Sequence, residues 1–206
     1  MDFSVEAFKW DTNERVKRAK IIAEKIQETI NIAEHFTALE FGCGTGLVSF
    51  NLFEKFESIT LVDTAKGMID VVNEKISKHS IKNMKAVQID INKQVELTEK
   101  YDVIYTSMAL HHIKDTETTL INLHTLLKNN GQLCIVELSK DDGVFHKSEQ
   151  DFDGHNGFEQ DELKELLEKI GFRGVTYEVF FSDTKVIDCT EVKYSLFLMK
   201  AEKSDE

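Results

Sequence analysis

The stretch LEFGCGTG at residues 39–46 decides how this chain folds. Apolar residues precede it and helical spacing follows it, so we predict that a first strand turns into a helix here. Its glycines, Gly42, Gly44 and Gly46, permit positive φ angles and remove the side chains that would hold a ligand away from the backbone. The stretch therefore predicts a loop that can lie flush against a nucleotide-like molecule, although turns of this kind also serve purely structural purposes.

Apolar runs and segments with helical spacing alternate along the chain on either side of this loop. The predicted strands are 38–41, 59–62, 86–89, 103–105 and 133–138. The predicted helices between and after them are 47–56, 66–79, 116–128 and 160–170. Two β-rich stretches, 174–181 and 192–200, then follow each other without a helix. We therefore expect a doubly wound α/β fold: a mostly parallel seven-stranded sheet with an antiparallel C-terminal edge pair and helices on both faces.

Length and composition narrow the class of protein. With 206 residues, 41% hydrophobic and 30% charged, the chain is long enough for one α/β domain and lies well inside the globular range. The sequence shows neither a basic and apolar leader nor an apolar run of membrane-spanning length. Its three cysteines lack the spacing of a disulfide framework or a zinc site. We therefore expect a cytoplasmic protein without a membrane partner.

The formal net charge of -12 repels phosphate backbones, so nucleic acid is not an expected partner. A basic cluster near the N-terminus, Arg15, Lys17, Arg18 and Lys20, departs from this balance. It lies within residues 13–34, whose apolar stripe predicts an amphipathic helix packed on the domain. Because acidic residues share that helix, a solvated helix face explains the cluster better than a hidden nucleic-acid groove.

A carboxylate follows the next predicted strand, where Asp63 ends the run ITLVD. Its place beside the glycine loop suits acceptance of hydrogen bonds from two ribose hydroxyls. The alternative is an N-cap for the helix that begins near Lys66. The glycine spacing is GxGxG with Leu47 next, whereas a dinucleotide fingerprint is GxGxxG, so a nicotinamide-dependent oxidoreductase is disfavoured as an alternative.

Five stretches together carry a resemblance to a known family. They are LEFGCGTG at 39–46, LVD at 61–63, QIDI at 88–91, YDVIYTSMALHHIKD at 101–115 and LLKNNGQLCIVEL at 126–138. With them the sequence resembles the Rossmann-like (class I) S-adenosylmethionine-dependent methyltransferases of the small-molecule branch. The resemblance covers the order of elements from about residue 36 to the C-terminus. It implies S-adenosylmethionine as the cofactor and an unidentified small-molecule methyl acceptor.

The resemblance implies roles for the glycine loop and its neighbours. Gly42, Gly44 and Gly46 would contact the methionine and ribose portions of the cofactor, and Asp63 would be the ribose-binding acid. Glu40, an acid directly before the loop, has two interpretations. It orders the loop or reaches the cofactor's ammonium through water, or it simply accepts hydrogen bonds from backbone amides.

The resemblance also assigns the adenine and methyl ends. Asp90 looks like the acid that accepts from the adenine amino group, with Ile91 as an apolar wall, and Met68 resembles the residue that packs on the adenine. Ser107 and Met108 follow the fourth strand, where the family lines the methionine and methyl end.

Few catalytic groups are expected, because the sulfonium already activates its methyl and the enzyme mainly aligns donor and acceptor and excludes water. If a general base assists, His112 is a candidate; the alternative is that the paired His111 and His112 orient loops. His155 or Asn156, in the turn-rich segment 151–158, is a candidate for acceptor contacts; the alternative is an ordinary turn. No HExxH-like spacing supports a metal.

The opening segment resembles N-terminal extensions that cover the cofactor cleft in some methyltransferases of this branch. We therefore divide the chain into an N-terminal lid and helix, residues 1–35, packed on a methyltransferase domain, residues 36–206. Phe8 or Trp10 would close over the site, or else anchor the first helix to the core. A non-catalytic protein that binds S-adenosylmethionine for regulation is the second alternative to the enzyme.

Overall fold

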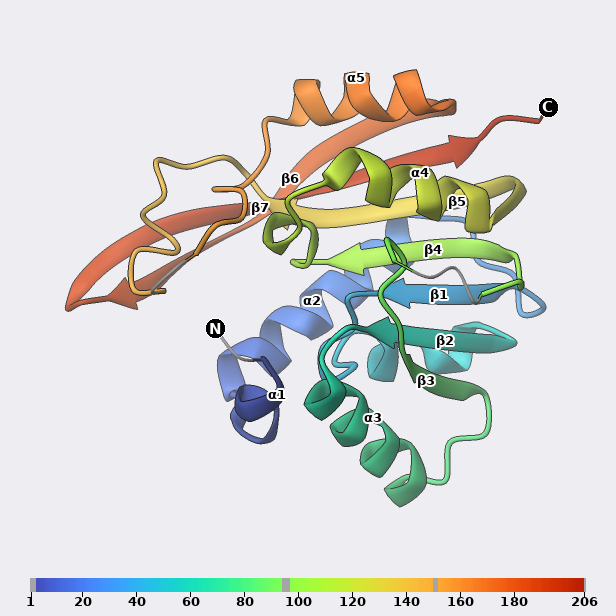
Figure 1. Cartoon of the computed structure of the whole chain (residues 1–206), viewed down its shortest axis with the longest axis horizontal. Coiled ribbons are helices and arrows are strands. Elements are labelled where there is room, and N and C mark those ends of the chain that lie inside the picture. Colours follow the sequence, from blue (N-terminus) through green and yellow to red (C-terminus); the bar gives the residue numbers. More distant parts are fainter. Residues whose placement is uncertain (1–2, 94–96, 150–151, 206) are drawn as a thin grey trace.

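The computed structural model describes residues 3–93, 97–149 and 152–205, and its framework is one sheet of seven strands (Figure 1). The strands are β1 Thr37–Phe41, β2 Ser58–Asp63, β3 Met84–Gln88, β4 Tyr101–Ser107, β5 Leu127–Leu138, β6 Phe172–Ile187 and β7 Thr190–Lys203. Their order in the sheet is β3-β2-β1-β4-β5-β7-β6. Strands β1 to β5 pair in parallel, and β7 lies antiparallel between β5 and β6. The predicted fold class is confirmed.

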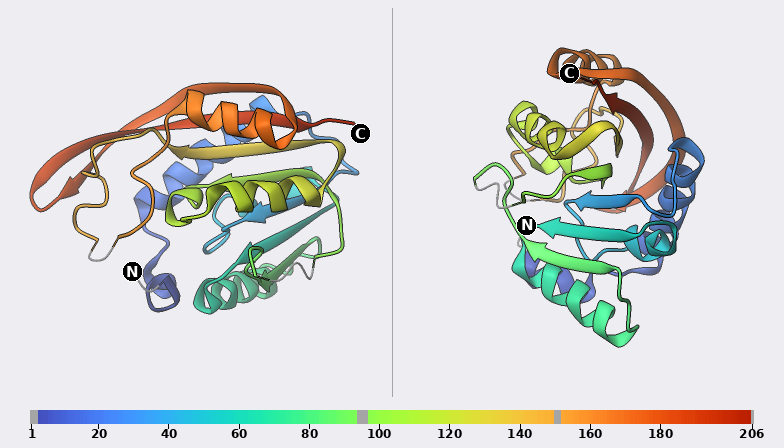
Figure 2. Two further views of the ribbon diagram at one scale, coloured as in Figure 1. Left: turned by 45° about the horizontal axis from the view of Figure 1, so that its top comes forward. Right: turned by 90° about the vertical axis from the view of Figure 1, so that its right-hand side faces the viewer.

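Helices cover both faces of the sheet, as the end-on view in Figure 2 shows. They are α1 Phe3–Glu6, α2 Asn13–Thr29, α3 Lys66–Lys78, α4 Thr116–Leu126 and α5 Gln160–Ile170. Strand β1 shows how the sheet serves two cores: Ala38 packs in the cluster that includes α2 and α3, and Leu39 packs in the cluster that includes α4 and α5. Because successive side chains of a strand point to opposite faces, a strand that is covered on both sides is mostly apolar, and buried Glu40 is the exception in β1.

The segment predicted as a helix over 47–56 is instead two 3-10 turns, η2 Ser49–Asn51 and η3 Phe53–Lys55. The Asn51 side-chain amide donates to the Leu47 carbonyl at 2.8 Å, the acceptor that an α-helical backbone N–H of Asn51 would use. The Asn51 backbone N–H donates to Val48 instead. Side chains that compete in this way disfavour α-helix, which explains the difference.

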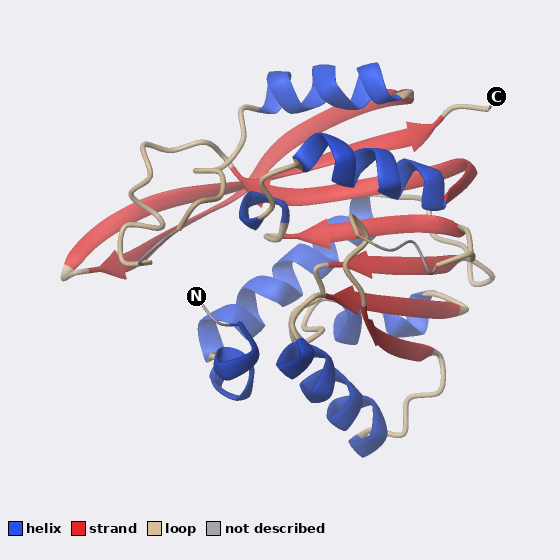
Figure 3. Cartoon of the chain, viewed as in Figure 1, coloured by secondary structure: helices blue, strands red, loops and turns tan. Residues whose placement is uncertain are grey.

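The C-terminal strands are longer than their predicted apolar stretches, and Figure 3 shows the hairpin of β6 and β7 running past the rest of the sheet. The extension carries mostly polar, exposed residues, so hydrophobic pattern alone does not reveal it. At its tip, Asp188 and Cys189 have φ angles of 48° and 61°. Two consecutive residues with positive φ form a tight turn whose twist matches that of the two strands of a hairpin. Such turns usually have the sequence Asn-Gly or Asp-Gly.

The remaining predicted elements agree with the structure to within a few residues, with two exceptions. Strand β5 begins at Leu127, six residues before the predicted start and inside the segment predicted as the helix 116–128. The first helix ends earlier than predicted. Helix α2 stops at Thr29, and Ile30 is extended. The next residue, Asn31, donates its backbone N–H to the Gln132 side chain and accepts from it. Within the described ranges, no helix has both the length and the apolar character needed to cross a membrane.

Candidate functional site

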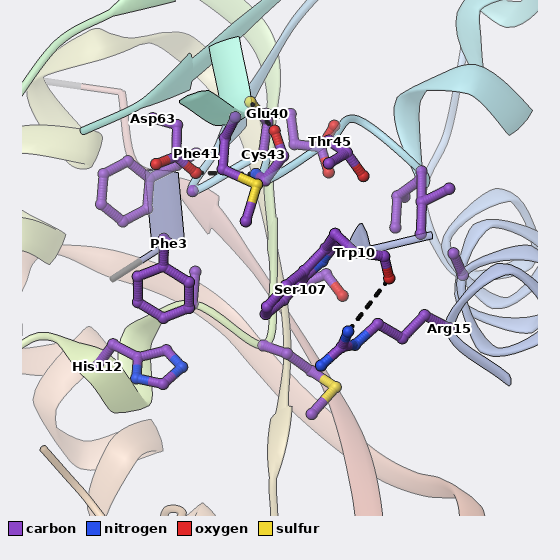
Figure 4. Close-up of a pocket in the computed structure, with 18 of the residues that line it drawn as sticks. Phe3, Trp10, Arg15, Glu40, Phe41, Cys43, Thr45, Asp63, Ser107 and His112 are labelled. Carbon is purple, nitrogen blue, oxygen red and sulfur yellow. Dashed lines mark hydrogen bonds between the residues drawn. The ribbon is translucent and has the colours of Figure 1, made fainter. Parts of the chain in front are cut away.

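A cavity of about 300 Å³ opens at the carboxyl ends of β1, β2 and β4. Strand β1 lies between β2 and β4, so the chain leaves it toward one side of the sheet and returns on the other. The loops that follow strands at such a switch point diverge and leave a crevice between them. Figure 4 shows the lining side chains, with Asp63 on one side of the cavity and Arg15 on the other.

The glycine loop forms one wall of this cavity, and its conformation excludes a side chain at Gly42. Gly42 has a φ of +66°, and a Cβ added there would lie 2.4 Å from the Cβ of Ala109. The Gly44 N–H donates to Asp63 Oδ2 at 2.8 Å, and the Ala65 N–H donates to Asp63 Oδ1 at 2.8 Å. The carboxylate of Asp63 therefore ties the loop to the end of β2.

Asp63 lines the cavity and is not the N-cap of α3. The N-cap position is Ala65, and no side chain caps the helix there. Burial raises the pKa of Asp63, and the hydrogen bonds from backbone amides oppose that rise. The N-cap alternative is thus excluded, while ribose binding stays a prediction.

Behind the loop lies a buried polar chain that the sequence did not reveal. The Ser49 hydroxyl donates to the Glu40 carboxylate, and the hydroxyls of Ser49 and Tyr105 are 2.7 Å apart. Burial raises the pKa of Glu40 to about 8. Glu40 also lines the cavity, so its hydrogen bond with Ser49 connects the turn η2 to the cavity wall.

The structure brings most of the predicted site residues to this cavity. Those that line it are Glu40, Gly42, Gly44, Asp63, Met68, Ser107, Met108 and His112. Gly46 does not line it: a Cβ there would lie 3.1 Å from both Leu61 and Phe50, so this glycine fits the loop onto the core.

Three other predicted residues lie away from the cavity. Asp90 forms an ion pair with Lys93 at 2.9 Å. Ile91 is buried in the core, and a different residue, Ile89, lines the cavity. The ring Nε2 of His155 lies 2.9 Å from the Ile113 carbonyl, and its backbone N–H donates to His111. Contacts of these residues with cofactor or acceptor stay predictions. Asp151, at the start of the predicted turn segment, lies outside the described residues.

The N-terminal segment covers the cavity. Phe3 and Trp10 line it, with their rings edge to face at 5.7 Å, and Phe3 packs against His112 at 5.0 Å. Phe8, the other proposed lid residue, is 76% exposed and points away. Among the two aromatic candidates, only Trp10 is placed to close the site.

Three contacts hold this segment to the glycine loop and α3. Asp11 pairs with Lys75 at 2.5 Å and accepts from the Thr45 hydroxyl. Ser4 packs directly on Gly67, where an added Cβ would lie 2.3 Å from the Ser4 carbonyl oxygen. The absence of a side chain at position 67 thus allows the segment to sit on α3.

Histidines gather at the other end of the cavity, around the 3-10 turn η4 Leu110–His112. Burial is the main reason that the pKa of His112 falls to about 3, so its ring is neutral at physiological pH. His111 Nδ1 lies 2.8 Å from Glu137, and both side chains are buried. The His146 ring stacks on Phe152 at 3.8 Å. No group of three or more ligating side chains in the described part of the chain is arranged to hold a metal ion.

The basic cluster of α2 divides between solvent and the cavity. Lys17 and Lys20 are exposed, as a solvated helix face predicts. Arg15 and Arg18 are partly buried and line the cavity, so that interpretation is wrong for them. In the helical spacing, Arg15 and Arg18 border the apolar stripe, and this position was the sequence signal that they could be partly buried.

Comparison with known proteins identifies the family. A family profile described as a methyltransferase domain matches residues 32–171. An uncharacterized methyltransferase of Schizosaccharomyces pombe is 37% identical over 115 residues, covering 52% of this chain and 40% of that protein. A hybrid PKS-NRPS synthetase of Penicillium citrinum is 31% identical over 129 residues, which cover 59% of this chain and 3% of the synthetase. The chain thus spans less than half of these relatives.

Solved structures share the fold at low identity. A SAM-dependent methyltransferase from Aquifex aeolicus has a TM-score of 0.70 and 20% identity, covering 97% of each chain. Haemonchus contortus phosphoethanolamine N-methyltransferase 2, in complex with S-adenosyl-L-methionine, has a TM-score of 0.71 and 14% identity over 91% of this chain and 53% of that one. Because the profile matches well over half of the sequence, this chain belongs to the methyltransferase domain family, whose members use S-adenosylmethionine.

Proposed function

We propose that this chain transfers the methyl group of S-adenosylmethionine to a small-molecule acceptor by in-line displacement. One observation carries the proposal: two positions without side chains, Gly42 and Gly44, and the Asp63 carboxylate face one cavity, which the N-terminal segment covers. Loop positions without Cβ atoms beside a strand-end carboxylate suit an adenosyl group.

The residues present fit that group. Each oxygen of Asp63 already accepts one backbone hydrogen bond, and a carboxylate has about four lone-pair sites, so further sites serve ribose hydroxyls. Met68 and Ile89 supply an apolar wall for the adenine. The predicted adenine contacts of Asp90 and Ile91 would require the turn after β3 to approach the cavity.

Bound S-adenosylmethionine supplies a methyl group that its sulfonium already activates. The residues of the chain therefore need to align the acceptor and exclude water. Phe3 and Trp10 cover the cavity, and Ser107 and Met108 line it after β4. Neutral His112 is available to accept a hydrogen bond from the acceptor, and its pKa of about 3 disfavours a general-base role. His155 contacts the Ile113 carbonyl, and its role toward the acceptor stays a prediction.

We also propose that residues 1–35 act as the lid of the domain formed by residues 36–206. The packing of Phe3 and Trp10 over the cavity supports this division. A cytoplasmic location is part of the proposal, in keeping with three cysteines that form no disulfide.

Calorimetric titration with S-adenosylhomocysteine tests the donor site, with NAD⁺ titrated in parallel. The proposal expects saturable binding of S-adenosylhomocysteine, none of NAD⁺, and loss of affinity of about tenfold or more in Asp63→Ala. Asp70→Ala, an exposed carboxylate of α3, is the matched control. Absence of binding refutes the proposal. Binding without methyl transfer to any acceptor in a broad panel favours the regulatory alternative.

A further inference from the structure

Two guanidinium groups line the cavity of a chain whose net charge is -12. Arg15 lies over the Trp10 ring, 3.8 Å from its centroid, and donates to the Trp10 carbonyl at 3.2 Å. Arg18, one helical turn later, donates to the Tyr194 hydroxyl at 3.1 Å. We refer to Arg15 and Arg18 as the arginine pair.

The arginine pair has no close counter-ion in the part of the chain that the structure describes. Among the described residues, every ion pair within 4.0 Å involves a lysine or a histidine, and none an arginine. Burial and the neighbouring Arg18 charge lower the pKa of Arg15, and the charges of Glu6, Glu149 and Asp11 oppose that shift. Partly buried cations that lack a paired carboxylate are costly unless a ligand supplies the anion.

A third cation lies on the same side of the site. Lys185, on the β6–β7 hairpin, lies over the Phe145 ring at 4.3 Å from its centroid, and its pKa is lowered by burial and then by Arg15 and Arg18. Glu149 partly offsets this positive field. The edge-to-face pair of Phe145 and Tyr194, 5.1 Å apart, forms an aromatic boundary next to these charges.

The position of the arginine pair favours the acceptor rather than the donor. Tyr194, the partner of Arg18, is on β7, and three strands, β1, β4 and β5, lie between β7 and the strand that carries Asp63. If Asp63 holds the ribose, the arginine pair lines the side of the cavity that is opposite the ribose. Buried His146, whose two ring nitrogens lack a hydrogen-bond partner among the described residues, lies 5.9 Å from the cavity-lining His112.

We propose that the arginine pair binds an anionic group of the methyl acceptor, a carboxylate or a phosphate monoester. This inference rests on the proposed function. Guanidinium groups bind both anions through paired N–H donors, and the described contacts of each arginine use one of its five. The cofactor's own methionine carboxylate has the same chemistry, so the experiment has two arms that separate the two sources.

The first arm assays methyl transfer to small carboxylates and phosphate monoesters, each matched with the neutral ester or alcohol of the same skeleton. We expect transfer to the anionic members only. Arg18→Gln is expected to raise the KM for them by about 10- to 100-fold with a smaller change in kcat, and Arg18→Lys to restore part of the loss. Lys17→Gln, which removes the same charge from the exposed face of α2, is expected to leave KM unchanged.

The second arm compares binding of S-adenosylhomocysteine with that of 5′-methylthioadenosine, which lacks the amino-acid group. Arg15→Gln and Arg18→Gln are expected to change neither affinity by more than about twofold. A selective loss of S-adenosylhomocysteine affinity would assign the arginine pair to the cofactor and overturn the inference. Equal transfer to neutral and anionic members would overturn it as well.

If no panel member is methylated, benzoate and inorganic phosphate are titrated into protein saturated with S-adenosylhomocysteine. Trp10, the single tryptophan of the chain, reports binding through its fluorescence because Arg15 lies over its ring. A saturable change that disappears in Arg18→Gln supports the inference, and no change in the unmodified protein overturns it. Failure of the proposed function is distinct, because S-adenosylhomocysteine itself would then not bind.

Discussion

Gly67→Ala tests whether the N-terminal segment is a lid, because the substitution should stabilise helix α3 while it displaces the segment from the helix. Gly67 is the second residue of α3, and alanine in a helix is more favourable than glycine by up to about 1 kcal/mol. The new Cβ would lie 2.3, 2.7 and 2.9 Å from backbone atoms of Ser4. Ordinary contact begins near 3.4 Å, so the Ser4 backbone must withdraw by about 1 Å.

The expected cost follows from that overlap. Overpacking of this kind costs about 1–3 kcal/mol, which the protein relieves by releasing the segment rather than by unfolding. At 1.4 kcal/mol per tenfold change, the covered state loses roughly tenfold in relative population. The affinity for S-adenosylhomocysteine should therefore fall about tenfold while the melting temperature stays the same or rises.

The assay is Trp10 fluorescence together with calorimetry and thermal unfolding. Release of the segment exposes Trp10, so its emission should shift to longer wavelength. Asn73→Ala, on the exposed face of α3, is the control because it changes helix propensity without touching the segment. If Gly67→Ala keeps wild-type emission, donor affinity and turnover, the lid argument is wrong.

Three further predictions concern the loop and the buried acid. Gly42→Ala should weaken S-adenosylhomocysteine binding at least tenfold, since its Cβ meets Ala109 at 2.4 Å and its φ is positive; the double variant with Ala109→Gly should recover part of the loss by calorimetry. Asp63→Asn should weaken binding less than Asp63→Ala, because an amide oxygen can still accept one of the two backbone hydrogen bonds. Glu40 holds its proton more tightly in the folded than in the unfolded protein. As pH rises from 4.5 to about 8, the free energy of unfolding of the wild type should therefore fall relative to that of Glu40→Gln, by up to about 1.4 kcal/mol per pH unit. Denaturant titrations at each pH measure this difference.

Each of these has a clear contrary result. A double variant no better than Gly42→Ala would show that backbone strain alone causes the loss. Equal affinities of the Asn and Ala variants at position 63 would show that the tie to Gly44 does not matter for binding. A stability difference that is constant with pH would show that Glu40 ionises normally in the folded protein.

The parts of the site that local pattern encodes were predictable. Strand, glycine loop and strand-end acid follow one another within 25 residues, so the sequence alone was enough to place Gly42, Gly44 and Asp63 together. Ser107 and Met108 could be placed because Ser107 is the last residue of β4 and Met108 follows it.

Contacts between distant segments could not be predicted in this way. Arg18 and Tyr194 are 176 residues apart, and the period of α2 shows only that Arg18 borders an apolar stripe. Asp90 lies at a strand end like Asp63, yet its neighbour Lys93 engages it. Which partner a strand-end acid takes depends on side-chain geometry in the following turn, and sequence spacing does not determine that geometry.

The tip of the β6–β7 hairpin offers a practical consequence for measuring motion in this protein. Cys43 and Cys134 are buried, and burial raises the pKa of both thiols, to about 12 for Cys134, whereas Cys189 at the tip is exposed. A maleimide dye should therefore attach at one position without any engineered cysteine. Trp10 in the covering segment and a dye at Cys189 would make a donor–acceptor pair within the natural sequence, so opening of the site becomes observable by energy transfer in real time.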